Sequence, residues 1–225
     1  MKRILFVLLT TALCFTAKAQ IHELGVFAGG ANYIGDVGPT DYVAPGDIAV
    51  GILYKWNRSP RHSWRASFTY GNISSNDADS EMPSRKQRGF EIENNIKELS
   101  AGLEFNFFDF NLHESGFLIT PYVYSGLSYA WFNELYIDTD GVGKEDGNNK
   151  SIAIPMTVGI KTRIAEKLIL GVEAGARYTF SDNLDGSNPD NQQRMHFGNL
   201  DSNDWYVFTG LTLTYTFGNK PCYCN

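Results

Sequence analysis

The sequence predicts an all-β protein, an eight-stranded antiparallel transmembrane β-barrel with short periplasmic turns and long extracellular loops. Three observations lead to this fold class. The first 19 residues have the form of a secretory signal, and eight later runs alternate apolar and polar residues at period two. The connections between those runs are long and short in turn, as in transmembrane barrels.

The N-terminal segment carries the parts of a secretory signal. Lys2 and Arg3 form a charged start, residues 4–17 form an apolar run, and Ala17-Lys18-Ala19 fits the small-x-small cleavage pattern. We therefore expect three parts: a signal peptide at residues 1–19, an outer-membrane β-barrel at 20–217 and a periplasmic tail at 218–225.

Charge and hydropathy argue against a nucleic-acid-binding protein and against a mature chain with transmembrane helices. Loss of Lys2, Arg3 and Lys18 with the signal lowers the net charge from −6 to −9, and an acidic chain is a poor partner for nucleic acid. No later stretch approaches the roughly 18 apolar residues of a transmembrane helix. A mature chain that crosses a membrane must then do so as a closed barrel, with outer-membrane lipid around it.

The final run, residues 205–217, shows the strand pattern best. One face carries Trp205, Val207, Thr209, Leu211, Leu213, Tyr215 and Phe217, and the other carries Tyr206, Phe208, Gly210, Thr212, Thr214 and Thr216. The run is long enough for a tilted membrane-spanning strand, which needs about 9–11 residues. Aromatic residues stand at both ends of its apolar face, where a headgroup girdle is expected.

Seven earlier runs repeat this alternation. In chain order they are residues 23–33, 48–56, 63–73, 96–107, 117–132, 151–164 and 168–180. Their apolar faces are, run by run, Leu24, Val26 and Ala28; Val50, Ile52, Tyr54 and Trp56; Trp64, Ala66, Phe68 and Tyr70; Leu99, Ala101, Leu103, Phe105 and Phe107; Phe117, Ile119, Val123, Leu127, Tyr129 and Trp131; Ile152, Ile154, Met156, Val158, Ile160 and Ile164; Leu168, Leu170, Val172, Ala174, Ala176, Tyr178 and Phe180.

The connections follow a regular order. Segments 34–47, 74–95, 133–150 and 181–204 are long, and segments 57–62, 108–116 and 165–166 are short. From a periplasmic N-terminus the long segments are the first, third, fifth and seventh connections. These are the extracellular positions of an eight-stranded barrel.

Charged residues fall on the face opposite the apolar one. They are Glu23, Lys55, Arg65, Glu98, Glu104, Lys161, Arg163, Glu173 and Arg177. Four acids and five bases nearly cancel, and we expect them to pair as a network inside a narrow barrel, because unpaired buried charges cost several kcal/mol each. Glycines on the same face leave room for such side chains, and Trp56, Trp64, Trp131 and Trp205 lie near run ends on the apolar face. The structural alternative is a soluble barrel of the lipocalin kind, with its apolar face inward.

The sequence predicts no enzyme, no metal and no cofactor. Asp138, Asp140, Asp182 and Asp185 offer oxygens to calcium, but Asp-Gly pairs are ordinary turn chemistry and a twelve-residue calcium loop is missing. The histidines have no metal-ligand spacing and no glycine-flanked nucleophilic serine accompanies them; they are His22, His62, His113 and His196.

Two cysteines, Cys222 and Cys224, lie in the tail. Cysteines one residue apart form a strained bridge, so pairing within the chain is disfavoured. They are either reduced tail thiols or a covalent or metal-mediated link to a periplasmic partner.

Several stretches together resemble one family. They are Glu23–Asp36, Leu103–Phe108, Pro121–Tyr124, Gly175–Phe180 with Asp182, Leu184 and Asp185 after it, and Asn203–Thr212. They resemble the PorG-like outer-membrane barrels of the Bacteroidetes type IX secretion system, over nearly the whole mature chain. The resemblance implies a noncatalytic accessory barrel that docks a periplasmic ring, made of a lipoprotein and its partner, to the outer membrane. On this reading Cys222, Cys224 and the turns at 57–62 and 108–116 are the expected contacts. Where family members carry a longer acidic stretch, this chain has Ser181-Asp-Asn-Leu-Asp-Gly.

A different class of function stays open on sequence alone. A stand-alone surface barrel of the OmpA or OmpW kind would bind extracellular ligands through its long loops. The two readings differ in which side of the membrane the partner occupies.

Overall fold

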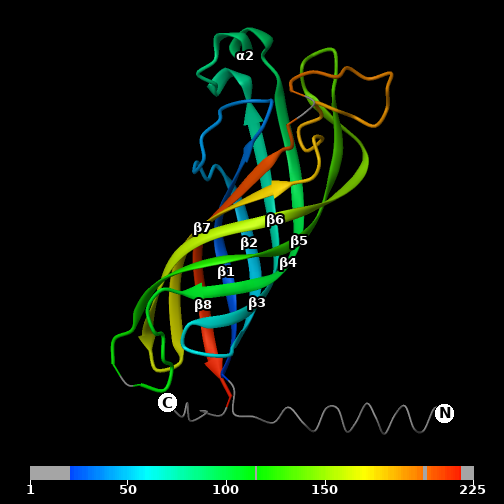
Figure 1. Ribbon diagram of the computed structural model, residues 1–225. Coiled ribbons are helices and arrows are strands. Elements are labelled where there is room, and N and C mark those ends of the chain that lie inside the picture. The colour runs from blue at the N-terminus through cyan, green and yellow to red at the C-terminus, as the bar shows by residue number, and fades with distance from the viewer. Residues whose placement is uncertain (1–20, 115, 200–201, 219–225) are drawn as a thin grey trace, which may run out of the picture.

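Eight antiparallel strands close into one barrel in the computed structural model, which describes residues 21–114, 116–199 and 202–218 (Figure 1). The strands are β1 (Ile21–Ile34), β2 (Asp47–Asn57), β3 (His62–Asn76), β4 (Glu91–Asn106), β5 (Ile119–Ile137), β6 (Gly143–Ala165), β7 (Leu168–Thr179) and β8 (Trp205–Phe217). Each strand pairs with its neighbours in the chain, and β1 pairs with β8. The ring therefore has no open edge, and the predicted fold class is confirmed.

The barrel has two unlike ends. Short turns join β2 to β3, β4 to β5 and β6 to β7, and we name this side the turn end. The other side, the loop end, carries residues 35–46, 77–90, 138–142 and 180–204. Figure 1 shows α2 and the β5–β6 hairpin projecting from the loop end, opposite the start of β1 and the end of β8.

The expected long loop at residues 133–150 is wrong. β5 continues to Ile137 and β6 begins at Gly143, so most of this segment is a paired ribbon with a register shift between Glu134 and Leu135. The β6 half of the ribbon, residues 143–150, is polar on both faces and mostly exposed, whereas Leu135 and Ile137 of the β5 half are buried. Hydropathy alternation cannot detect the β6 half, since it has no apolar face.

The hydrophilic segment at residues 74–95 is also more ordered than predicted. β3 runs to Asn76, a 3₁₀ turn covers Asp77–Asp79, and a short helix, α2, covers Pro83–Arg88 before β4 begins. Proline at the first turn and Gly89 at φ 71° bound this helix in the usual way. No helix in the described part of the chain is long and apolar enough to cross a membrane.

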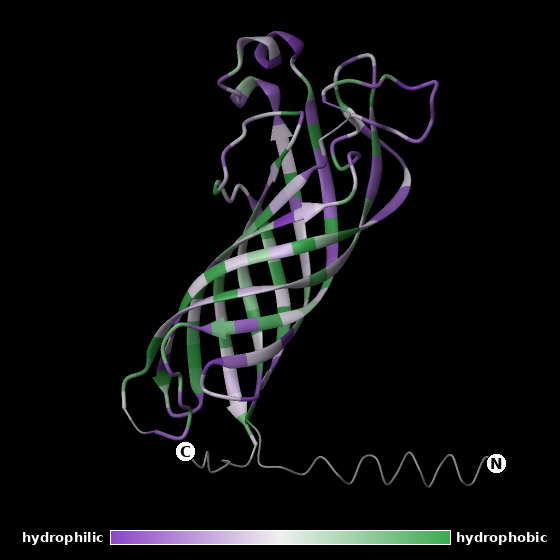
Figure 2. Ribbon diagram, in the orientation of Figure 1, coloured by the Kyte–Doolittle hydropathy of each residue, from purple (hydrophilic) through white to green (hydrophobic). Residues whose placement is uncertain are grey.

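A belt of exposed apolar side chains surrounds the barrel. Every strand contributes to it, and its members are 40–60% exposed: Leu24, Val26, Val50, Ile52, Phe68, Leu99, Leu103, Leu127, Ile152, Met156, Val158, Ile160, Val172, Leu211 and Leu213. Figure 2 shows this apolar banding on the barrel body and more hydrophilic residues at the loop end. The apolar face of each strand points outward, so a soluble barrel with its apolar face inward is excluded. An apolar outer surface of this extent is typical of a barrel that crosses a lipid bilayer.

Aromatic residues border the belt. Trp56 and Trp64 are cross-strand partners near the turn end. Near the loop end Trp131 is 39% exposed, and Trp205 packs against Tyr178 with ring centroids 5.0 Å apart. Tryptophan and tyrosine prefer the headgroup region, so the two rings of aromatics mark the two membrane interfaces.

Candidate functional site

The lumen holds eight of the nine charged residues that the sequence places on the inner face. None of them is more than 4% exposed: Glu23, Lys55, Arg65, Glu98, Glu104, Lys161, Glu173 and Arg177. Four acids meet four bases, so the lumen is electrically neutral. Buried charges are tolerated when they are paired and hydrogen-bonded in this way.

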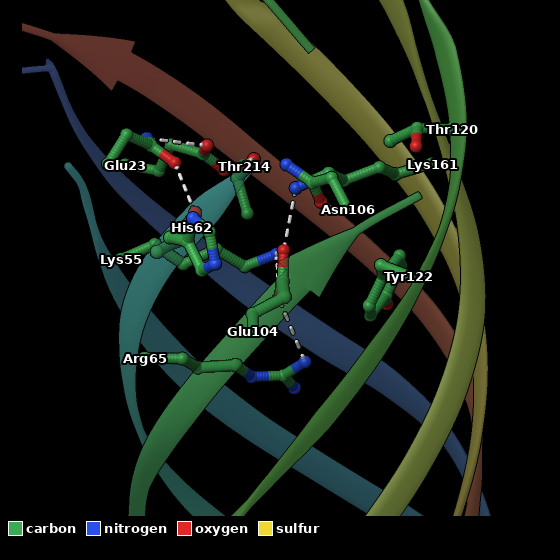
Figure 3. A network of polar contacts seen from close by, with 12 residues as sticks. Glu23, Lys55, His62, Arg65, Glu104, Asn106, Thr120, Tyr122, Lys161 and Thr214 are labelled. Carbon is green, nitrogen blue, oxygen red and sulfur yellow. Dashed lines mark hydrogen bonds and ion pairs between the residues drawn. The ribbon is translucent and has the colours of Figure 1, made fainter. Parts of the chain in front are cut away.

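Glu104 is the centre of the charge network in the half of the lumen nearer the turn end (Figure 3). Its Oε1 accepts hydrogen bonds from Nζ of Lys55 at 2.9 Å and from Nζ of Lys161 at 2.6 Å. Its Oε2 lies 2.7 Å from Lys55 Nζ and 3.6 Å from Arg65 Nη1. One carboxylate thus contacts cations from β2, β3 and β6 and ties these strands together across the lumen.

Arg65 joins this cluster to a second acid. Its Nη1 and Nη2 donate to the two oxygens of Glu173 at 2.7 and 2.6 Å, a bidentate pair that fixes both side chains. The hydroxyl of Tyr122 donates to the same carboxylate at 2.5 Å. β3, β5 and β7 are therefore linked through a single carboxylate.

Glu98 and Glu23 complete the set. Glu98 accepts from Arg177 Nε at 3.2 Å and from the Tyr206 hydroxyl at 2.6 Å. Glu23 accepts from Asn57 Nδ2 and from Thr214 Oγ1, each at 2.8 Å. The second of these bonds fastens β1 to β8 at the closing seam.

Two glycines make room for these long side chains. A Cβ on Gly159 would lie 2.6 Å from the Tyr122 ring, and one on Gly175 would lie 2.4 Å from Arg177 Nη1. Both distances are far below van der Waals contact. This agrees with the sequence argument that glycines on the charged face leave space in a narrow lumen.

Arg163 lies outside this network, in contrast to the sequence expectation. It is half-buried at the turn end, where its guanidinium donates to the carbonyl oxygens of Glu114 and Gly116. The register of β6 against β7 shifts between Arg163 and Ala165, so the strand is already leaving the barrel at this point. A long side chain there reaches the neighbouring turn more easily than the lumen.

The half of the lumen nearer the loop end is apolar, which the sequence analysis missed. Its cluster comprises Phe27, Ala31, Tyr33, Val37, Ala49, Leu53, Ile73, Ile92, Ile96, Ala130, Phe132, Leu135, Ile137, Leu184, Tyr206 and Phe208. Phe27, Leu53, Tyr206 and Phe208 alternate with the predicted outward residues of their strands, so the pattern places them on the inner face. Their clustering depends on register between distant strands, which one sequence does not reveal.

Leu184 closes this apolar half from the last loop. It is fully buried, its carbonyl accepts from Asn94 Nδ2 at 2.9 Å, and its amide donates to Asp204 Oδ2 at 2.9 Å. The Tyr33 hydroxyl donates to the other oxygen of Asp204 at 2.5 Å. Burial, followed by the negative charge of Asp185, raises the pKa of the Asp204 carboxyl well above its ordinary value. Burial likewise raises the pKa of Asp185.

Phe110 closes the turn end. It is 4% exposed, and Lys161 Nζ lies 4.9 Å from its ring centroid. Its amide donates to the Pro60 carbonyl, and Arg61 pairs with Asp109 at 2.5 Å, so the turns at 57–62 and 107–118 form one surface. Phe108 stays 59% exposed on that surface.

The lumen between these closures has almost no free volume. A cavity beside Arg65, Glu173 and Phe208 measures about 10 Å³, which is near the minimum for a single water molecule. Side chains therefore fill the interior, as expected for eight strands. A barrel of this kind is no path for a folded or unfolded protein.

The remaining predicted sites carry no chemistry that the structure describes. Cys222 and Cys224, like the signal at residues 1–19, lie outside the described residues. Asp138 accepts from the amides of Asp140 and Val142, as a turn residue does. Within the described ranges no group of three or more histidine, cysteine or acidic residues is arranged to hold a metal ion.

Comparison with known proteins gives one family and a set of similar folds. Residues 2–225 match the family described as "Domain of unknown function (DUF6089)". No curated protein matches the sequence.

Solved structures of outer-membrane barrels are similar over most of the chain. Ail, the attachment invasion locus protein of Yersinia pestis, is 8% identical, with 88% of this chain and 99% of that one covered and a TM-score of 0.44. A major outer membrane protein from Thermus thermophilus is 12% identical, with 88% and 100% covered and a TM-score of 0.47. The outer membrane enzyme PagL is 14% identical, with 86% and 98% covered and a TM-score of 0.41. At these identities the similarities say nothing about ligand or activity.

Proposed function

Because this chain belongs to the family described as a domain of unknown function (DUF6089), whose description assigns no activity, we propose from its own features that it is a noncatalytic accessory barrel of the type IX secretion system. In this role it docks a periplasmic ring, built from a lipoprotein and its partner, to the outer membrane. The resemblance to PorG-like barrels supports the assignment to the secretion system, and the filled barrel supports a docking role.

The filled lumen is the observation that carries the proposal. The charged network, the apolar cluster and the closures by Leu184 and Phe110 leave no conduit. A barrel without a conduit acts through its surfaces, and one that is cross-linked by buried ion pairs is a stiff support. The four buried glutamates of the charged network are also hydrogen-bonded or ion-paired within the lumen, which supports a noncatalytic role.

The turn end has the features of a docking surface. Its two longer turns are joined by backbone hydrogen bonds and by the Arg61–Asp109 ion pair. Phe108 and Phe117 project from the same side with 59% and 76% exposure. Exposed aromatics on a rigid base are typical anchors of protein interfaces. With short turns in the periplasm, this surface faces the compartment of the ring.

The experiment is capture of the tagged barrel from gently solubilised native membranes, with mass spectrometry of the proteins that accompany it. We expect the ring lipoprotein and its partner in the wild type and a loss of both in a Phe108→Ser/Phe117→Ser variant. A Met82→Ser/Met195→Ser variant is the matched control, because it removes two similarly exposed apolar side chains at the loop end. Nonreducing gels of a Cys222→Ser/Cys224→Ser variant test the covalent link separately.

Two outcomes contradict the proposal. Recovery of the barrel alone from wild-type membranes would show that it does not bind the periplasmic ring. Loss of partners only in the loop-end variant favours the stand-alone surface barrel, for which the ordered ribbon and α2 at the loop end provide a folded binding surface.

A further inference from the structure

A depression crosses the outward face of β7 and β8 near the loop end. Two registered rows of mainly small residues form it: Met156–Ala176–Val207–Asn32 and Val158–Ala174–Thr209–Gly30. The row on the loop side carries Tyr178 and Trp205, and the row on the turn side carries Val172 and Leu211. In each of the two rows β6 contributes a large side chain and β7 an alanine, so the surface is low between β6 and β1.

The loop at residues 35–46 walls the other side of this depression. It folds back over the outward face of β1, where Asn32 Nδ2 donates to the Asp41 carbonyl at 3.0 Å and Asn32 Oδ1 accepts from the Ala44 amide at 3.3 Å. A Cβ on Gly30 would lie 2.6 Å from Pro45 Cβ, so glycine is needed for this close approach. The result is a groove of about 650 Å³ with an apolar floor.

Apolar side chains of the loop face this groove without cover from the protein. Tyr42 is 81% exposed and Val43 is 57% exposed, and both line the groove, as do Met156 and Val158. Met156 and Val158 are also members of the belt. The floor of the groove is therefore continuous with the lipid-facing belt, and Trp205, which marks the interface, also lines the groove.

We propose that this groove holds one acyl chain of an outer-leaflet lipid, which enters sideways from the bilayer. A chain has no polar groups to satisfy, whereas a peptide on the same floor would bury backbone amides without partners. The volume is within the range of small-molecule sites, about 300–1,000 Å³. The rim mixes Asp36 and Asp204 with Arg85, whose guanidinium donates to the Gly35 and Gly38 carbonyls. A rim of mixed charge selects no anionic headgroup, so the chain itself is the ligand.

Lipid binding in this groove does not depend on the secretion ring. The lipid fills the space between the barrel wall and the first loop. The bound chain replaces water against Tyr42 and Val43 and holds the loop against the barrel.

Photo-crosslinking in vesicles tests the assignment. The protein is reconstituted into phosphatidylethanolamine vesicles that contain the same lipid with a diazirine on its acyl chain, and crosslinks are mapped by mass spectrometry. We expect labelling to concentrate on the peptides of Tyr42 and Met156, compared with those of Leu103 and Leu127 across the barrel. Even labelling around the belt would overturn the proposal.

Native mass spectrometry of protein released from membranes in mild detergent supplies the variant test. Ala176→Phe fills the floor, while Ala101→Phe makes the same change on an outward alanine of β4 away from the groove. We expect the control to retain one lipid and Ala176→Phe to retain about tenfold less, the effect of displacing two methylenes of the chain. A Tyr42→Ser/Val43→Ser variant changes only the exposed loop and gives the same readout if Ala176→Phe fails to fold. Equal lipid retention in all variants, or a protein found crosslinked to Tyr42, would refute the assignment.

Discussion

Replacement of Glu104 by glutamine is expected to destabilise the barrel strongly. The Glu104 carboxylate lies 2.6–2.9 Å from the ammonium groups of Lys55 and Lys161 and 3.6 Å from Arg65, and all four side chains are at most 4% exposed. The amide keeps the shape but removes the charge, which leaves the lumen with one uncompensated positive charge. Loss of one partner of a buried ion pair costs about 3–5 kcal/mol. This corresponds to a rise of about 10² to 10⁴ in the unfolded-to-folded ratio.

The measurement is urea unfolding of the protein in lipid vesicles, monitored by tryptophan fluorescence. The free energy of unfolding is extrapolated linearly to zero urea, with the same slope against urea concentration for all variants. Asp109→Asn is the control, because it breaks the Arg61 pair at the turn end, where the side chains are 50% and 67% exposed. Such exposed pairs contribute about 0–1 kcal/mol.

A double variant separates charge balance from packing. Glu104→Gln/Lys161→Met removes one acid and one base, so the lumen is neutral again. We expect it to recover about 1–3 kcal/mol of the loss, within the usual coupling between residues in contact. A Glu104→Gln variant as stable as Asp109→Asn, or a double variant less stable than the single one, would refute the reasoning.

Three further predictions concern the lumen and its closure at the loop end. Leu184→Ala leaves a cavity under the loop end and should cost about 2–5 kcal/mol in the same urea experiment; a change below about 1 kcal/mol would mean that the loop does not seal the barrel. The raised pKa values of Asp185 and Asp204 mean that the folded loop binds protons more tightly than the unfolded chain, so its stability is full below the ordinary carboxyl pKa of about 3.9 and declines as pH rises through the raised values. Hydrogen-exchange protection of the Leu184 amide measures this, and protection that stays constant or increases with pH would contradict it. Gly159→Ala places a methyl group against Tyr122 and should cost about 1–3 kcal/mol, whereas an alanine at Gly46, where a Cβ meets only the Ala44 carbonyl oxygen at 3.8 Å, should cost less than about 0.5 kcal/mol.

Period-two alternation was enough to predict the barrel because each strand has one face in lipid. β8 begins and ends where the sequence pattern begins and ends, at Trp205 and Phe217. Where both faces meet water, as in residues 143–150 of β6, the pattern disappears and that part of the strand is missed. The placement of the inner charges was predictable for the same reason, because a charge opposite an apolar face has only the lumen to enter.

The missed features depend on contacts across the barrel. Phe27 and Phe208 stand on inward sets in strands at opposite ends of the chain, and only the β1–β8 register brings their rings to 6.5 Å. Leu184 lies in a loop whose path follows from its bonds to Asn94 and Asp204. Arg163 was misplaced because alternation assigns a side and takes no account of where a strand leaves the barrel. Each error concerns tertiary geometry that a single sequence does not encode locally.

The pairing of β1 with β8 has a consequence for the speed of folding. All the other strand pairings join strands that are consecutive in the chain. The β1–β8 pairing joins residues that are far apart in the sequence, such as Thr214 and Glu23, which are 191 residues apart. The entropic cost of long-range closure is concentrated in this single step, which is expected to be slow. The same seam resists opening once it has formed, because rupture exposes two strand edges to lipid at once. The lifetime of the barrel in the membrane is thus governed by a rate, the opening of one seam, more than by the sum of its contacts.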